Sequence, residues 1–172
     1  MISQEDFVSR CRAALSESQP ALAVKDVVEQ AVTDGIDGLS DKPGIRVLSC
    51  DEALTVAHVV VPSGQPKSLP HDHRMWAVIG ICEGKEDNEF FRRAGLSLEA
   101  SGGRQVPAGE VVMLGQEVIH RIQNPLTHGS LSALHVYGGD LPSTSRSMWT
   151  GPEWTEEPYD ERAVTGTTFI RS

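Results

Sequence analysis

Two histidines separated by one residue, His71 and His73, stand in the segment LPHDHRMWAVIGIC as side chains that could bind a metal ion. In a strand, successive side chains alternate faces, so both imidazoles would point the same way with Cα atoms about 6–7 Å apart. A third imidazole, His120, lies in the later β-like segment GQEVIHRIQN. The sequence therefore predicts a metal site formed by His71, His73 and His120. Two solvated histidines on a turn after Pro70 are the alternative, because the motif is short.

Two helices are predicted ahead of these histidines. A capping box begins at Ser3, and apolar residues then recur at helical spacing to about Glu17, which is typical of a first helix. Pro20 suits the first turn of a second helix, and Gly35 suits its end.

The rest of the chain predicts β structure, because short runs rich in Val, Ile, Leu and Phe alternate with Gly, Pro, Asn and Asp. The expected strands are Ile45–Cys50, Leu54–Val61, Arg74–Cys82, Glu89–Ala94, Val111–Leu114, Val118–Gln123 and Leu131–Gly138. Many short strands indicate a sandwich or closed barrel. The Pro-, Ser- and Trp-rich stretch from Leu141 should wrap the outside and close a barrel edge near Thr168–Ile170. We expect a helical segment, 1–36, packed on a barrel with its C-terminal wrap, 37–172, in one domain.

Composition excludes several classes of partner. The 172 residues carry a formal net charge of −9 and no cluster of Lys or Arg, so nucleic acid is not expected as a partner. No apolar run approaches the length of a membrane span, and no leader is recognisable. Three scattered cysteines suit a reducing compartment. The sequence therefore predicts a cytoplasmic protein without a membrane partner, and it leaves a homodimer open.

Gly64, the pair His71 and His73, and later His120 with Asn124 resemble the two halves of the cupin metal motif. The resemblance implies a mainly β fold, a cupin-type double-stranded β-helix or jelly-roll barrel, preceded here by the two N-terminal helices.

A cupin usually carries a glutamate four or five positions beyond the second histidine, where this chain has Ala77 and Val78. The cupins that it resembles in lacking this carboxylate are the thiol dioxygenases, namely cysteine dioxygenase and the bacterial 3-mercaptopropionate dioxygenases. These enzymes bind iron through three histidines alone. The resemblance covers about residues 44–150 and implies one Fe(II) ion as cofactor and O2 as co-substrate.

His135 and Tyr137 match a histidine and a tyrosine beside the iron site of those enzymes, which implies a catalytic role for both. The serine that usually completes this hydrogen-bonded chain would stand at Ala133. The series of hydrogen bonds is therefore shorter here, unless the hydroxyl of Ser130 or Ser132 contacts His135. The strand period places Ser132 on the opposite face. As an alternative, His135 and Tyr137 are core residues whose polar atoms have hydrogen-bond partners.

Two arginines are candidates for binding a substrate carboxylate. Arg146 stands where the resemblance to the mercaptopropionate enzymes implies a carboxylate-binding arginine, and Arg46 corresponds roughly to the one of cysteine dioxygenases. A guanidinium offers two parallel donors that match a carboxylate. Both arginines could instead be surface residues paired with acids.

The expected chemistry follows from the ligand set. Three neutral imidazoles leave Fe(II) with its double charge, so a thiol would bind as thiolate. The sequence predicts a thiol dioxygenase that converts a small thiol carboxylic acid, of the cysteine or 3-mercaptopropionate type, to its sulfinate. The alternatives are a non-catalytic metal-binding or small-molecule-binding cupin, and a zinc or manganese isomerase or hydrolase, which the missing acidic ligand disfavours.

The remaining histidines and charges have simpler interpretations. His58 is expected in the core or at its rim, and His128 in a solvated turn. The run GKEDNEFFRR, with Glu86 and Asp87, is expected to form a solvated turn and edge strand, or an interface.

Overall fold

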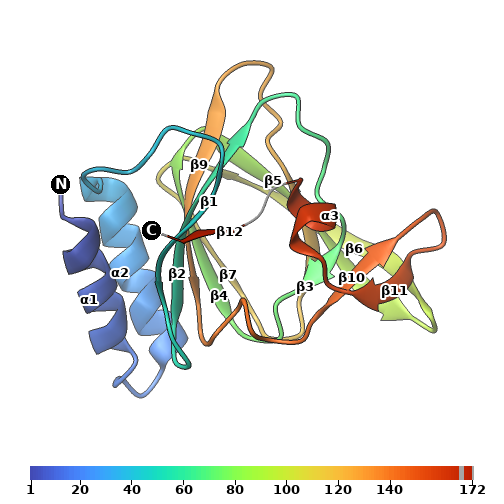
Figure 1. Ribbon diagram of the computed structural model, residues 1–172, viewed down its shortest axis with the longest axis horizontal. Coiled ribbons are helices and arrows are strands. Elements are labelled where there is room, and N and C mark those ends of the chain that lie inside the picture. The colour runs from blue at the N-terminus through green and yellow to red at the C-terminus, as the bar shows by residue number, and fades with distance from the viewer. Residues whose placement is uncertain (167–168, 172) are drawn as a thin grey trace.

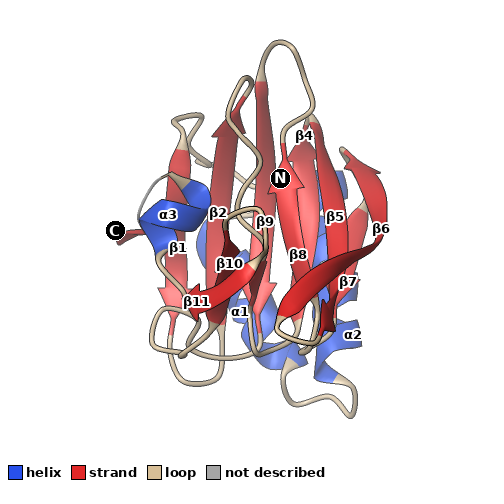
Figure 2. Cartoon of the chain, turned by 90° about the vertical axis from the view of Figure 1, so that its right-hand side faces the viewer, coloured by secondary structure: helices blue, strands red, loops and turns tan. Residues whose placement is uncertain are grey.

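Two sheets of six strands each face one another and form a jelly-roll barrel, as Figures 1 and 2 show. The computed structural model describes residues 1–166 and 169–171. The first sheet contains, in order, β12 (Phe169–Arg171), β1 (Gly44–Cys50), β2 (Thr55–Pro62), β9 (Ser130–Tyr137), β4 (Ala77–Glu83) and β7 (Val111–Leu114). The second contains β11 (Thr155–Pro158), β10 (Ser147–Thr150), β3 (His71–Asp72), β8 (Ile119–Gln123), β5 (Lys85–Ala94) and β6 (Ser97–Pro107). The predicted mainly β, cupin-type fold with two N-terminal helices is thereby confirmed.

Helices α1 (Gln4–Ala14) and α2 (Pro20–Asp34) cover the outer face of the first sheet (Figure 1). The Ser3 side chain caps α1 by accepting a hydrogen bond from the Asp6 backbone N–H at 3.0 Å. At Gly80 of β4 a Cβ would lie 2.4 Å from a Val28 methyl carbon, so the absence of a side chain allows α2 to approach the sheet.

Strand alternation separates the side chains of the first sheet into two cores. In β9, Leu134 and Val136 face the helices, whereas Ala133 and Tyr137 face the barrel interior. Because successive side chains of a strand point to opposite faces, the same alternation also decides which of its polar side chains point into the barrel.

The strand predicted for Arg74–Cys82 is shorter in the structure. Strand β3 contains only His71–Asp72, the chain bends at 73–76, and β4 begins at Ala77. At the bend, Arg74 adopts a left-handed φ of 59°, and its Nε lies 2.8 Å from a carboxylate oxygen of Asp72. The other Asp72 oxygen accepts a hydrogen bond from the Ser147 backbone N–H at 2.8 Å. Asp72 therefore holds the bend that directs His73.

The second sheet departs most from the predicted strands. Strand β5 begins at Lys85, four residues before the predicted start at Glu89, and pairs with β6, which was not predicted. The mostly exposed edge strand β6 carries Ser and Gly where alternating apolar residues would have marked a strand.

The C-terminal wrap has structure of its own, since β10, β11 and the short helix α3 (Glu161–Thr165) follow Leu141. The predicted edge near Thr168–Ile170 falls partly outside the described residues, at Thr168, while β12 pairs in parallel with β1 at the edge of the first sheet. None of the helices in the described part of the chain is long and apolar enough to cross a membrane.

Candidate metal centre

The structure brings His71, His73 and His120 together inside the barrel. His71 of β3 is the direct cross-strand partner of His120 of β8, and His73 follows at the bend. The Nε2 atoms of His73 and His120 lie 3.4 Å apart, and one ligand atom from each of the three rings lies within 4.8 Å of the others. Nitrogens bound to one ion at about 2.1 Å lie roughly 3 Å or slightly more apart, so the cluster has the size of a metal site.

Two of the three rings are oriented by hydrogen bonds to their Nδ1 atoms. His71 Nδ1 lies 2.9 Å from the backbone oxygen of Leu69, and His120 Nδ1 lies 2.9 Å from Asn88 Oδ1. Because both partners are acceptors, each Nδ1 carries the proton and donates it. The Nε2 lone pairs of His71 and His120 are then free to bind an ion.

Burial keeps this histidine cluster (His71, His73, His120) uncharged. Desolvation lowers the pKa of His71 to about 4 and holds the pKa of His73 and His120 well below the ordinary value. Neutral imidazole is the form that binds metal ions.

A buried polar pair lies behind His120. Asn88 of β5, whose Oδ1 accepts from His120, donates through Nδ2 to Glu86 Oε1 at 2.8 Å. Glu86 is fully buried, and its Oε2 has no hydrogen-bond partner among the described residues. Burial raises the pKa of Glu86 to about 7. The expected solvated turn is therefore wrong for Glu86, because β5 extends through it and alternation turns Glu86 and Asn88 inward.

The donor set fits a metal ion. Among the described residues, the group that could hold an ion consists of three histidines without a carboxylate. Two rings are fixed as Nδ1–H tautomers, all three rings are buried, and their free nitrogens converge. A divalent transition-metal ion is the ligand that this arrangement suits.

His135 and Tyr137 form one wall of the site. The Tyr137 hydroxyl lies 2.8 Å from His135 Nδ1, and the Tyr137 ring centroid is 5.0 Å from that of His73. Desolvation raises the pKa of Tyr137, so the phenol stays protonated. His135 Nε2 is buried without a hydrogen-bond partner among the described residues, on the strand face that also carries Ala133.

Ser132 does not enter this wall. Its hydroxyl lies 2.8 Å from Nε2 of His58, a buried histidine on the neighbouring strand β2. The predicted position of His58 in the core and of Ser132 on the opposite face of β9 are both confirmed. His128 is exposed, as expected.

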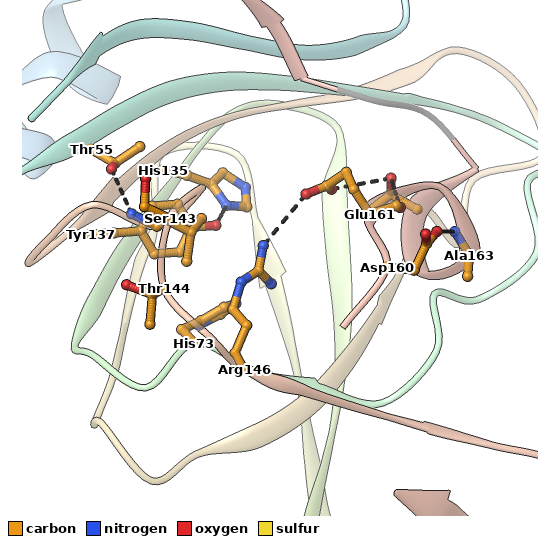
Figure 3. A network of polar contacts seen from close by, with 12 residues as sticks. Thr55, His73, His135, Tyr137, Ser143, Thr144, Arg146, Asp160, Glu161 and Ala163 are labelled. Atoms are coloured by element: carbon orange, nitrogen blue, oxygen red, sulfur yellow. Dashed lines mark hydrogen bonds and ion pairs between the residues drawn. The ribbon is translucent and has the colours of Figure 1, made fainter. Parts of the chain in front are cut away.

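Arg146, Tyr159 and Glu161 line the same cavity as the histidines. Figure 3 shows Arg146 and Glu161 joined by their side chains on the side of the site that holds His73 and Tyr137. The guanidinium carbon sits 3.2 Å from the Tyr159 ring centroid, and Arg146 Nη2 donates to Glu161 Oε2 at 3.4 Å. The Tyr159 backbone N–H donates to the Arg146 carbonyl at 2.9 Å, so the hairpin of β10 and β11 places both residues together. We call Arg146, Tyr159 and Glu161 the arginine cluster.

The cavity between the histidine cluster and the arginine cluster has a volume of about 50 Å³, which suits a small ligand. Apolar walls come from Ile45, Ala57, Val59 and Leu141. Such walls limit the access of water to the histidines.

Arg46 is not brought to this site. Ile45, its neighbour on β1, lines the cavity, so alternation turns Arg46 to the other face, where it pairs across strands with His58. Its Nη1 donates to the Lys42 carbonyl at 2.6 Å. Of the two predicted anchors, the structure places only Arg146 beside the histidines.

Four residues near the site were missed in the sequence: Glu86, Asn88, Tyr159 and Glu161. The first two could have been found, because Glu86, Asn88 and Phe90 alternate on one face of a strand. Tyr159 and Glu161 lie in a segment without a periodic pattern, so no local signal marks them.

Comparisons with known proteins support the fold. No protein-family model matches the chain. An RmlC-like cupin with a double-stranded β-helix from Methanocaldococcus jannaschii matches with a TM-score of 0.50 and 17% identity, over 63% of this chain and 90% of that one. Hydroquinone 1,2-dioxygenase from Sphingomonas sp. TTNP3 matches with a TM-score of 0.46 and 8% identity, over 58% of this chain and 69% of that one. Oxalate decarboxylase from Lactobacillus farciminis matches with a TM-score of 0.42 and 18% identity, over 62% of this chain and 27% of that one. At 17% identity, the first of these matches shows the likeness of the double-stranded β-helix fold alone.

Proposed function

We propose that this protein is an Fe(II)-dependent thiol dioxygenase that converts a small thiol carboxylic acid of the cysteine or 3-mercaptopropionate type to its sulfinate. The observation that carries the proposal is the convergence of three neutral imidazoles without a carboxylate ligand among the described residues. When bound, Fe(II) would supply an undiminished double charge that favours the thiolate, and O2 would contribute both oxygen atoms to the sulfur. The overall reaction balances, since a thiol and one O2 give one sulfinic acid.

The chain's own residues position the substrate. Arg146, which is buried and lines the cavity, is a donor for the substrate carboxylate. Tyr137 stays protonated, and its hydroxyl can donate a hydrogen bond toward the reacting atoms while His135 holds its orientation. Leu141 and the other apolar side chains line the cavity and limit the access of water to the reacting atoms. A cytoplasmic location agrees with a thiol substrate and stays a prediction, as does a homodimer.

The proposal is tested by metal analysis and oxygen consumption. Protein purified without added metal should contain near-stoichiometric iron and consume O2 with at least one thiol among cysteine, 3-mercaptopropionate, mercaptosuccinate and cysteamine. Arg146→Ala should retain iron and raise KM for acidic thiols at least tenfold. Iron without thiol-dependent oxygen uptake would reject the dioxygenase.

One observation favours a second candidate, a non-catalytic metal-binding or small-molecule-binding cupin. His135 Nε2 lacks a partner among the described residues, and Ala133, where the resemblance implies a serine, carries no hydroxyl. A shortened chain of hydrogen bonds is less suited to holding Tyr137 for catalysis. The oxygen measurement separates the two functions.

A further inference from the structure

The arginine cluster contains a carboxylate of the chain itself at the place where a substrate carboxylate would bind. Glu161, the first residue of α3, contacts the Arg146 guanidinium, and Figure 3 shows the two side chains pointing toward one another. Only 4% of the Arg146 side chain and 14% of the Glu161 side chain are exposed. This pair is therefore held inside the site and is not a solvated surface contact.

Glu161 leaves most of the guanidinium available. Its contact with Arg146 is one hydrogen bond of 3.4 Å, at the long end of the range, without the two parallel bonds of a guanidinium and carboxylate in ideal geometry. The guanidinium carbon of Arg146 lies over the Tyr159 ring. A ligand carboxylate could thus bind Arg146 and would then lie close to the Glu161 carboxylate.

Charge decides which ligands tolerate this neighbour. A thiol with a carboxylate alone brings a second negative charge against Glu161, which is unfavourable in a buried site. A thiol with an ammonium group beside its carboxylate brings a partner for each side chain, since the carboxylate binds Arg146 and the ammonium binds Glu161. The pair has the charge pattern of a subsite for a zwitterion.

The position of Glu161 is fixed by contacts on several sides. Asp160 caps α3 by accepting from the Ala163 backbone N–H at 2.7 Å, and the Leu69 backbone N–H donates to the Val164 carbonyl at 3.3 Å. The Thr165 hydroxyl lies 3.3 Å from Glu161 Oε1. Because Leu69 also accepts from His71, α3 and the histidine cluster are attached to the same short segment.

We propose that Glu161 is a specificity-determining residue that, together with Arg146, selects thiols carrying both an ammonium and a carboxylate group over thiols carrying a carboxylate alone. This inference rests on the proposed function and narrows it to substrates of the cysteine type. Both side chains line the cavity that contains the three histidines, so a small molecule can reach all of them.

The test compares cysteine with 3-mercaptopropionate, which differ by the ammonium group. The wild-type protein should have the higher kcat/KM with cysteine. Glu161→Gln, which keeps the size of the side chain and removes its charge, should lower kcat/KM for cysteine and raise it for 3-mercaptopropionate, moving their ratio at least tenfold. Glu157→Gln on the exposed strand β11 is the matched control and should leave the ratio unchanged.

A binding measurement separates failure of this inference from failure of the proposed function. Anaerobic calorimetric titration of the iron-loaded protein with each thiol should show the same reversal of preference in Glu161→Gln. If no thiol causes oxygen uptake but the binding preference reverses, the dioxygenase fails and the subsite stands. The inference is overturned if Glu161→Gln changes the affinity for both thiols by the same factor or leaves both affinities unchanged. It is also overturned if neither thiol binds. Circular dichroism and thermal unfolding establish that the variant is folded.

Discussion

The histidine cluster and the arginine cluster bound one cavity but are built differently. His71 and His120 are direct partners in the ladder between β3 and β8, and His73 follows at the bend after β3. The arginine cluster comes from the ends of a hairpin and a short helix, and it is joined by side-chain contacts. A strand pairing fixes the positions of backbone atoms, whereas a side-chain cluster depends on a few mutual contacts. We therefore expect metal binding to depend on the first cluster and ligand choice on the second.

The strongest test of this division is His120→Ala, which removes one of three ligands. We expect the protein to lose essentially all retained metal, because two imidazoles without further protein ligands bind an ion far more weakly. Metal content is measured by atomic emission after gel filtration. His128→Ala, at an exposed histidine, should retain the wild-type metal content. Full occupancy in His120→Ala would place the metal elsewhere.

Glu86 gives the histidine side of the cavity a dependence on pH. Burial raises its pKa from 4.5 to about 7, so between these values the folded protein binds more protons than the unfolded chain. Its contribution to stability is complete below pH 4.5 and is lost as the pH rises through about 7. Glu86→Gln should remove this loss. As the pH rises from 4.5 to above 7, the free energy of unfolding of the variant should therefore increase by about 3 kcal/mol relative to that of the wild type.

The measurement for Glu86 is the free energy of unfolding of metal-free protein, by denaturant titration at several pH values. The exposed Glu83→Gln variant on β4 is the control and should follow the wild-type curve. Parallel curves for Glu86→Gln and wild type would show that the buried carboxyl is not protonated in the folded protein.

Asn88→Ala tests whether the residue behind His120 contributes to metal binding. The substitution removes the acceptor that holds the His120 Nδ1 proton, and it should weaken metal affinity by about 10- to 100-fold. Affinity is measured by competition with a chromophoric chelator. Gln105→Ala, an exposed residue that contacts Asp87 on the other face of β5, should bind metal as the wild type does. A change of less than twofold in Asn88→Ala would show that strand pairing alone orients the ring.

Ala133→Ser probes the wall between the two clusters and should have the smallest effect. A hydroxyl on this buried face would offer His135 Nε2 a partner. It should therefore raise the oxygen-uptake rate of the proposed dioxygenase by about two- to fivefold and the free energy of unfolding by about 1 kcal/mol. Ser132→Ala, on the opposite face, should leave the rate unchanged. An unaltered rate in Ala133→Ser would mean that the missing serine does not limit Tyr137.

Local sequence predicted the elements well where burial is one-sided. The capping residue Ser3 and the helical spacing of the apolar residues after it identified the first helix, because apolar spacing follows the buried face. Pro20 and Gly35 marked the two ends of the second helix. It failed at β6, where an exposed edge strand held by pairing has no apolar period. It also failed at the bend after His71, because the contacts of Asp72 with Ser147 and Arg74 join distant and local residues.

The sequence by itself indicated the three histidines as candidate ligands, from the spacing of His71 and His73 and from the β-like segment around His120. Their convergence depends on the bend after Asp72 and on the pairing of β3 with β8. The sequence also indicated the cupin fold. Only the tertiary structure decided which arginine faces the histidines, and that Glu86 and Asn88 lie behind His120. The tertiary structure also decided the pairing of Arg146 with Glu161. The physical reason is that burial and charge pairing depend on segments far apart in the chain, so the same residue type can lie in a cavity or on a surface.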